Sequence, residues 1–399
     1  MLRTVTLLTC LLLITFSLSK LNAQNSDSRQ CEPKVCEQRI RQHIEHLASE
    51  KLQGRRGIHA IQAAEYVAEE FQKLNLQPVF KSLENKAARS YFQSIPAAPD
   101  KNGKSMTAGK NVAGLFIGCD ARLKDEYIIV AAHHDHLGKK RDGIFFGADD
   151  NASGVAMVLE VARVLSTSPT PTKRSVLFVS FDLEEHLLFG SRWFTAHPPV
   201  PLKQVKMMIV ADMLGRSLGD LPMDSFFLFG CEHAGGVSKL VSRIPFAEKA
   251  KPVLLSDDFV GTRSDYGPFR DRKIPFLFAS TGQSKDYHTV RDTADKINCE
   301  QVTAISQGLA VLAKRLSNLD QAPVWIDKPK VSLAEVEAIL KIVTEIEKKA
   351  TDWKLNTVQR LFVSQARIQT KRILKNQKMS PQEQARLMRT TQMLLFTVF

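Results

Sequence analysis

Short, almost continuously apolar runs alternate with helical segments through the middle of this chain of 399 residues. Six runs have the length and composition of buried strands: 111–117, 126–132, 175–181, 206–212, 225–230 and 274–280. Between two of them, residues 152–165 have the pattern of a largely buried helix. Strands that are apolar along their whole length must be covered on both faces, as in parallel sheets flanked by helices. The sequence therefore predicts an α/β fold with a largely parallel, twisted central sheet and helices on both faces.

Helical patterns flank this region on both sides. Apolar residues recur at helical spacing through 37–76, with a glycine-marked turn, QGRRGIH, at 53–59. From about residue 326 the sequence is strongly helical and basic, and Ser380 has the setting of the N-cap of a last helix. We therefore expect a main domain over 24–325 and a helical C-terminal extension over 326–399, in which no chemistry is apparent.

The first 23 residues have the pattern of a signal peptide. Arg3 supplies the positive start, residues 6–18 are mostly apolar, and residues 21–23 form a small-residue cleavage site before Gln24. The apolar run is too short to span a bilayer comfortably, so we expect removal of the segment rather than a membrane anchor. The protein is therefore predicted to be exported, to the periplasm or the extracellular space.

Charge and cysteine content add two constraints. The formal net charge is +13, but the basic residues are spread along the chain except for a cluster near the C-terminus. No nucleic-acid motif accompanies them, so we interpret the charge as solvated surface and expect no nucleic-acid partner. Five cysteines remain after signal removal, and Cys31 and Cys36 are close enough to form a small disulfide loop.

Acids and histidines follow the ends of several predicted strands. They are His133 and Asp135, Asp149 and Asp150, Glu184 and Glu185, Asp212, and Tyr287 with His288. Because ligands bind beyond the carboxyl ends of parallel strands, we expect these groups to converge on one edge of the sheet. Singly, each has a structural interpretation as a helix cap, a surface charge or a turn residue. Together, packed carboxylates repel one another unless cations neutralise them, and carboxylates mixed with imidazoles suit zinc better than calcium or magnesium.

Five of these segments also resemble a known family. In order, AAHHDHLG, GADDNASG, LEEHLLFGS, ADMLG and YHTVRDT resemble the signature of the co-catalytic two-zinc aminopeptidases. That family includes bacterial leucyl aminopeptidases and aminopeptidase Y, and its relatives include glutaminyl cyclases and glutamate carboxypeptidases. The resemblance extends from about residue 38 to about residue 318. It implies a zinc-dependent exopeptidase fold, two bound Zn²⁺ ions and peptide substrates.

The resemblance also implies a role for individual residues. The implied zinc ligands are His133, Asp150, Glu185, Asp212 and His288, with Asp150 bridging both ions. Glu184 would be the general base, and Asp135 would orient the imidazole of His133. Asp292 would support the last motif. These roles agree with the chemistry, because a ligating histidine usually donates its second N–H to a carboxylate or carbonyl.

Other residues near these motifs are candidates for substrate contact or structural support. Tyr287 is a candidate substrate contact, as are Ser264 and Asp265, although either of the latter two could equally be a helix cap. His134 should point away from the site, because successive strand side chains alternate. His136 has no implied ligand role and is interpreted as structural.

Three alternatives to an aminopeptidase stay open. Glutaminyl cyclisation on the same fold uses a single zinc in relatives, whereas all five ligand positions are filled here. A carboxypeptidase acting on acidic C-termini would need a basic pocket, for which Arg263 and Arg270 are candidates. A binding protein with a degenerate site would have lost a ligand or the base, and neither is lost. The sequence carries no signal for an oligomeric state.

Overall fold

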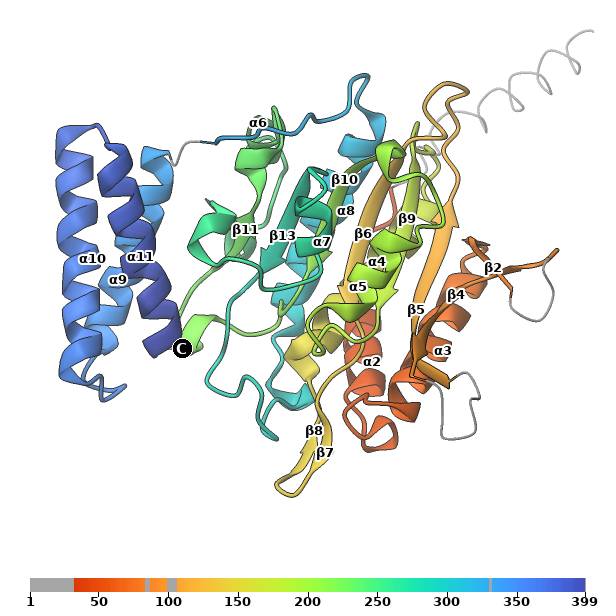
Figure 1. Ribbon diagram of the computed structural model, residues 1–399, viewed down its shortest axis with the longest axis horizontal. Helices are drawn as coiled ribbons and strands as arrows, with labels where there is room; N and C mark the ends of the chain where they lie inside the picture. Colours follow the sequence, from red (N-terminus) through yellow and green to blue (C-terminus); the bar gives the residue numbers. More distant parts are fainter. Residues whose placement is uncertain (1–31, 83–86, 99–105, 330–331, 399) are drawn as a thin grey trace, which may run out of the picture. The chain divides into compact units, whose positions relative to one another are not determined.

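A nine-stranded sheet forms the centre of the computed structural model, which describes residues 32–82, 87–98, 106–329 and 332–398 (Figure 1). The strand order is β1-β5-β9-β6-β10-β13-β11-β12, and β4 pairs with β5 off this path. The strands are β1 (Gln77–Pro78), β4 (Phe92–Ala97), β5 (Met106–Phe116), β6 (Tyr127–His133), β9 (Ser175–Phe181), β10 (Val205–Ala211), β11 (Ser225–Phe229), β12 (Lys251–Leu255) and β13 (Phe276–Ser280). Two small hairpins pair β2 (Phe80–Lys81) with β3 (Arg89–Ser90) and β7 (Gly138–Lys140) with β8 (Gly143–Phe145).

All six predicted strands are present, and the predicted α/β fold is confirmed. The four central strands, β9, β6, β10 and β13, are parallel, whereas β5 and β11 pair antiparallel with their inner neighbours, so the whole sheet is mixed. The sequence did not indicate β4 or β12, which contain Pro96 and Pro252. Proline cannot donate to the ladder and is confined to edges and irregular positions. Accordingly, β12 lies at the edge of the sheet, and the pairing of β4 shifts register between Ile95 and Pro96.

Helices cover both faces of the sheet (Figure 1). They are α2 (Glu37–Leu47), α3 (Ile58–Lys73), α4 (Gly154–Ser166), α5 (Phe189–Ala196), α6 (Val237–Val241), α7 (Gly267–Arg270), α8 (Cys299–Asn318), α9 (Leu333–Lys349), α10 (Thr357–Asn376) and α11 (Pro381–Val398). Successive side chains of β6 enter different cores: Val130 lies in the cluster that also contains buried residues of α2, α3, α4 and α8, whereas Ile129 lies in the cluster that contains buried residues of α5 and α7. The continuous apolar run of β6 thus reflects burial on both faces.

The C-terminal extension consists of α9, α10 and α11. Residues 332–377 read as one helical stretch but form two helices, because Asn356 caps α10 by accepting from the N–H groups of Val358 and Gln359. The predicted cap at Ser380 is present, since its hydroxyl accepts from the N–H of Glu383. Residues 34–399 form a single compact unit, and the predicted boundary at 325 lies between α8 and α9.

Two predictions concern the N-terminal segment. The predicted signal peptide, residues 1–23, lies outside the described residues, and so does Cys31 of the predicted Cys31–Cys36 disulfide, which stays a prediction. No helix in the described part of the chain combines the length and apolar character that crossing a membrane requires.

The turn between α2 and α3 brings the N-terminal helices against the carboxyl edge of the sheet. Gly54 has φ +74° and its carbonyl accepts from the N–H of Gly138, while the carbonyl of Arg55 accepts from the N–H of His136. A Cβ on Gly54 would lie 2.4 Å from the carbonyl oxygen of Phe145. The close approach of these backbones therefore requires glycine at this position.

Replacing Gly54 should destabilise the protein more than replacing its neighbour in the same turn. Gly57 also has a positive φ, +60°, but a Cβ there would meet nothing within 4 Å. Both G54A and G57A place an alanine at a positive φ, and Gly57, with ψ −122°, lies outside the left-handed helical region. Such backbone conformations cost ~1–3 kcal/mol for a residue with a Cβ. G54A adds a steric clash and should lose at least ~2 kcal/mol more in the free energy of unfolding, measured by urea denaturation. Equal losses in the two variants would contradict the close-approach argument.

Candidate active site

The carboxyl ends of the central parallel strands carry the predicted site residues. His133 is the last residue of β6, Asp212 follows β10, and Glu184 and Glu185 follow β9. Asp150 lies in the irregular turn before α4, where its backbone has φ −105° and ψ 92° and its peptide bond to Asn151 is cis. The predicted convergence on one edge is therefore present.

Five of these residues form two groups that share Asp150. In one group, His133 Nε2 lies 3.4 Å from Asp150 Oδ1 and 3.4 Å from Asp212 Oδ1. In the other, His288 Nε2 lies 3.1 Å from Asp150 Oδ2 and 3.3 Å from Glu185 Oε2. In each group the candidate ligand atoms lie within 4.8 Å of one another. The two carboxylate oxygens of Asp150 thus face different groups.

The donor set fits zinc. His133 Nε2 and Asp212 Oδ1 are buried and have no hydrogen-bond partner within the described residues. Buried polar atoms are rarely left without a hydrogen-bond partner. Two such atoms only 3.4 Å apart therefore indicate a site suited to a bound cation. Burial raises the pKa of Asp212, and a cation would oppose this effect. Imidazole and carboxylate side chains, gathered here in groups of three and four, are typical ligands of zinc.

Glu184 lies beside the two groups rather than within them. It lines the same cavity as Asp150, Asp212 and His288, but it does not belong to either ligand group. Burial raises its pKa well above the usual range, with a further contribution from Asp212. A carboxyl group with a raised pKa next to a metal site is suited to accept and return a proton.

Asp135 fixes the glutamate pair as well as His133. Its Oδ1 lies 3.5 Å from His133 Nδ1, which also contacts the Asp135 carbonyl at 3.2 Å. Its carboxylate also accepts from the N–H groups of Glu184, at 3.0 Å, and Glu185, at 3.3 Å. One carboxylate therefore positions residues from both groups and the candidate base.

The other two histidines of the AAHHDHLG segment have different surroundings. His134 points away from the groups, as expected, and its Nδ1 lies 2.9 Å from Ser180 Oγ. His136, interpreted above as structural, has its Nδ1 2.8 Å from Glu185 Oε1 and 3.8 Å from Asp150 Oδ2. His136 therefore belongs, with Asp150, Glu185 and His288, to the second group of candidate ligands, which its interpretation as structural did not anticipate. It is also close enough to Glu185 to hold that carboxylate in place.

The three candidate substrate contacts occupy different environments. Tyr287 stacks on the His288 ring, with centroids 3.9 Å apart, and lines the cavity. Ser264 and Asp265 are fully buried, do not line it, and burial raises the pKa of Asp265 to about 7. Their contact with substrate stays a prediction.

Of the two arginines considered for a carboxypeptidase pocket, only Arg263 is among the residues that line the cavity. Arg263 lines the cavity, with its Nε donating to the carbonyl of Val260. Arg270 instead pairs with Asp257, at 2.9 Å, and Asp257 also contacts His233. Arg270, Asp257 and His233 thus form an ion-pair network.

Asp292 holds the turn that carries Asp150. Its two carboxylate oxygens accept from the N–H groups of Asp149, at 2.9 Å, and Asp150, at 3.1 Å. The neighbouring Asp149 faces away from the ligand groups, and its Oδ1 accepts from the N–H of Gly215. Of the two aspartates in GADDNASG, Asp149 therefore supports the fold, and Asp150 belongs to the candidate metal site.

Arg55 is a buried support that the sequence analysis missed. Its guanidinium donates to five backbone carbonyls, those of Leu47, His134, Phe146, Gly147 and Asp150, at 2.6–3.4 Å. Burial lowers its pKa to about 10. The QGRRGIH segment reads as a turn, and nothing in it distinguishes the buried Arg55 from the exposed Arg56.

Fold and site together define a metallopeptidase of the zinc exopeptidase type. The chain belongs to peptidase family M28, whose sequence profile matches residues 111–313, half of the chain. Mouse (Mus musculus) endoplasmic reticulum metallopeptidase 1 is 28% identical over 218 residues, which are 53% of this chain and 23% of that protein. The match therefore spans about a quarter of the length of that relative.

Solved structures share the fold at lower identity. A zinc aminopeptidase from Bacillus subtilis superposes with a TM-score of 0.55 and 17% identity, over 73% of this chain and 98% of the other. Porphyromonas gingivalis glutaminyl cyclase superposes with a TM-score of 0.54 and 16% identity, over 71% of this chain and 99% of the other. Because similar folds carry different reactions here, fold alone does not select between hydrolysis and cyclisation.

Lysine should not be able to replace Arg55 in stabilising the protein. R55K keeps the positive charge but loses the fork of donors, which leaves buried carbonyls unpaired. We expect a loss of about 3 kcal/mol or more in the free energy of unfolding. R56K is the matched control, because Arg56 is exposed and should tolerate the change. Chemical denaturation of both variants measures the difference, and similar stabilities would contradict the role of Arg55.

Asp292 should strengthen metal binding without contacting the metal. D292N turns an acceptor of two N–H groups into a side chain with one acceptor and one donor. Loss of such support typically weakens metal affinity ~10–100-fold. D295N, a change at an exposed aspartate three residues away, should leave the affinity unaltered. Competition with a zinc-binding dye measures both, and an unchanged affinity in D292N would count against this support role.

Proposed function

We propose that this protein is an exported two-zinc aminopeptidase that removes N-terminal residues from peptides. The observation that carries the proposal is the position of Asp150, whose two carboxylate oxygens face two separate groups of candidate ligands. A short carboxylate shared in this way suits two ions held close together. Family membership and the signature of the first 23 residues support the rest.

In this proposal, His133 and Asp212 would hold one ion, Glu185 and His288 would hold the other, and Asp150 would contribute to both sites. When bound, zinc would supply Lewis acidity, which polarises the scissile carbonyl and acidifies a water molecule. Glu184 would take the proton from that water and return it to the leaving amine. His136 and Asp135 would keep Glu185 and the backbone of the glutamate pair in place.

Glutaminyl cyclisation is the competing reaction on this fold. The complete set of five ligand positions supports two ions, and two ions favour hydrolysis over a cyclisation that relies on a single zinc. Cyclisation would form pyroglutamate from N-terminal glutamine and release ammonia, which is a different product from a free amino acid. Product analysis therefore separates the two reactions.

Replacing the candidate base should remove activity but retain metal. E184Q is isosteric and lies outside the two ligand groups, so it should bind two zinc ions per chain, as should the wild-type protein. Its kcat on aminoacyl-arylamides should fall at least ~100-fold, because general-base catalysis contributes about that much. E337Q, at an exposed glutamate on α9, is the matched control. Metal analysis and steady-state kinetics are measured on the same preparations.

Three results would overturn the proposal. E184Q with wild-type activity would remove Glu184 from the reaction. One zinc per chain with pyroglutamate as product would assign the protein to the cyclase class. A wild-type protein that is secreted and loaded with zinc but inert on every N-terminal residue would exclude an aminopeptidase.

A further inference from the structure

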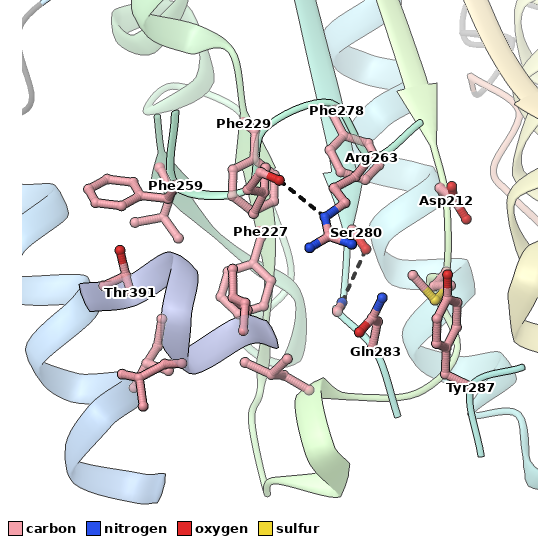
Figure 2. Close-up of a pocket in the computed structure, with 18 of the residues that line it drawn as sticks. Asp212, Phe227, Phe229, Phe259, Arg263, Phe278, Ser280, Gln283, Tyr287 and Thr391 are labelled. Carbon is pink, nitrogen blue, oxygen red and sulfur yellow. Dashed lines mark hydrogen bonds between the residues drawn. The ribbon is translucent and has the colours of Figure 1, made fainter. Parts of the chain in front are cut away.

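An apolar cavity connects the candidate active site with the C-terminal extension (Figure 2). Its volume is about 160 Å³. At one end lie Glu184, Asp212 and Tyr287, and at the other lie side chains of α9 and α11. Figure 2 shows Asp212 and Tyr287 on one side of the view and Thr391 on the other, with Phe227 between them.

Most of the walls beyond the acidic end of this cavity are apolar, although Arg263, Ser280 and Gln283 also line it (Figure 2). Phe227, Phe229 and Phe278 come from β11 and β13, and Leu255 comes from β12. The C-terminal extension completes the lining with Ile339, Ile342, Val343 and Ile346 of α9 and Thr391, Leu394 and Leu395 of α11. Packed cores leave few voids larger than a water molecule. A cavity of this size next to reactive groups therefore indicates a ligand site.

The extension is fixed to the peptidase domain at several points around the cavity. Gln392 donates to the carbonyl of Asp258, at 2.7 Å, and Glu335 accepts from the N–H of Ser256, at 3.2 Å. Lys285 lies over the ring of Trp353, 5.0 Å from its centroid, in the loop that leads to Tyr287. These contacts join α9, the turn after it and α11 to segments that line or flank the cavity.

The extension lies outside the region that defines the family. The family profile ends at residue 313, and α9 begins at Leu333. The far wall of the cavity is therefore a feature of this chain that family membership does not supply. Its chemistry must be read from its own side chains.

We propose that α9 and α11 form the far wall of a specificity pocket, which takes a large apolar side chain of the N-terminal residue. An apolar void of about 150 Å³ accepts a group the size of benzene. A phenylalanine or leucine side chain would fill the pocket and displace water from it, whereas alanine would leave it largely empty. This inference rests on the proposed function, because it assigns the substrate class of the same site.

Ile342 offers the most direct test. It lines the cavity from α9 and is only partly buried, so a larger side chain there should enter the pocket. In the wild-type protein, kcat/KM for phenylalanyl-arylamide should exceed that for alanyl-arylamide by ~10-fold or more, as expected from several buried methylene equivalents. I342W should reduce this ratio about 10-fold or more. A ratio is insensitive to the fraction of active enzyme.

I368W is the matched control. Ile368 lies on α10, is 60% exposed and does not line the cavity. The same substitution within the same extension should therefore leave the ratio as it is in the wild type. If I342W does not fold, I342A tests the same wall in the opposite direction. It should raise kcat/KM for a tryptophanyl substrate relative to a phenylalanyl one by about threefold or more.

The failure of this inference differs from the failure of the proposed function. If the arylamides are hydrolysed but the phenylalanyl-to-alanyl ratio is the same in the wild type, I342W and I368W, the pocket is refuted and the aminopeptidase stands. If no arylamide is hydrolysed, calorimetry of the zinc-loaded full chain with L-phenylalanine and L-alanine tests the pocket directly. Preferential binding of L-phenylalanine that is lost in I342W would support the pocket, and equal binding would overturn it.

Discussion

Asp150 is the residue on which the rest of the site depends. Its carboxylate lies between His133 and His288, which come from segments far apart in the chain, and each oxygen faces one of them. Burial acts to raise its pKa, but the surrounding imidazoles outweigh burial and hold that pKa well below its usual range. A buried carboxylate that stays charged in this way can attract cations from both sides. Asp292 holds the backbone of Asp150 itself, whereas Asp135 and His136 hold its partners His133 and Glu185 in place.

The sheet explains why these partners meet. His133, Asp212 and the glutamate pair follow β6, β10 and β9, which are parallel neighbours and therefore end at the same edge. The turn before α4 adds Asp150, and the loop after β13 adds Tyr287 and His288. A largely rigid layer of strands thus places side chains that the chain separates by more than a hundred residues, and loops supply only the last adjustments.

Much of this could be predicted from the sequence, for reasons that are local. The six strands are continuous apolar runs, and the residues that follow them are compact motifs whose chemistry is recognisable. The missed elements depend on distant contacts. The proline in β12 argues against a strand in the sequence, and β12 forms because it pairs with β11. The buried position of Arg55 depends on hydrogen bonds to carbonyls up to 95 residues away. Ile342 likewise reads as one apolar residue among many on a helix, and only the fold brings α9 to the active-site cavity.

The contacts of Arg55 have a consequence for how this protein can be divided. Arg55 precedes the region that defines the family, yet its donors join the end of α2 to the loops that carry His134, Gly147 and Asp150. A fragment trimmed to residues 111–313 would contain every candidate zinc ligand but would leave these carbonyls without their common donor. We therefore expect the smallest fragment that folds on its own to extend beyond residues 111–313 and to include Arg55, although this side chain is not a candidate ligand.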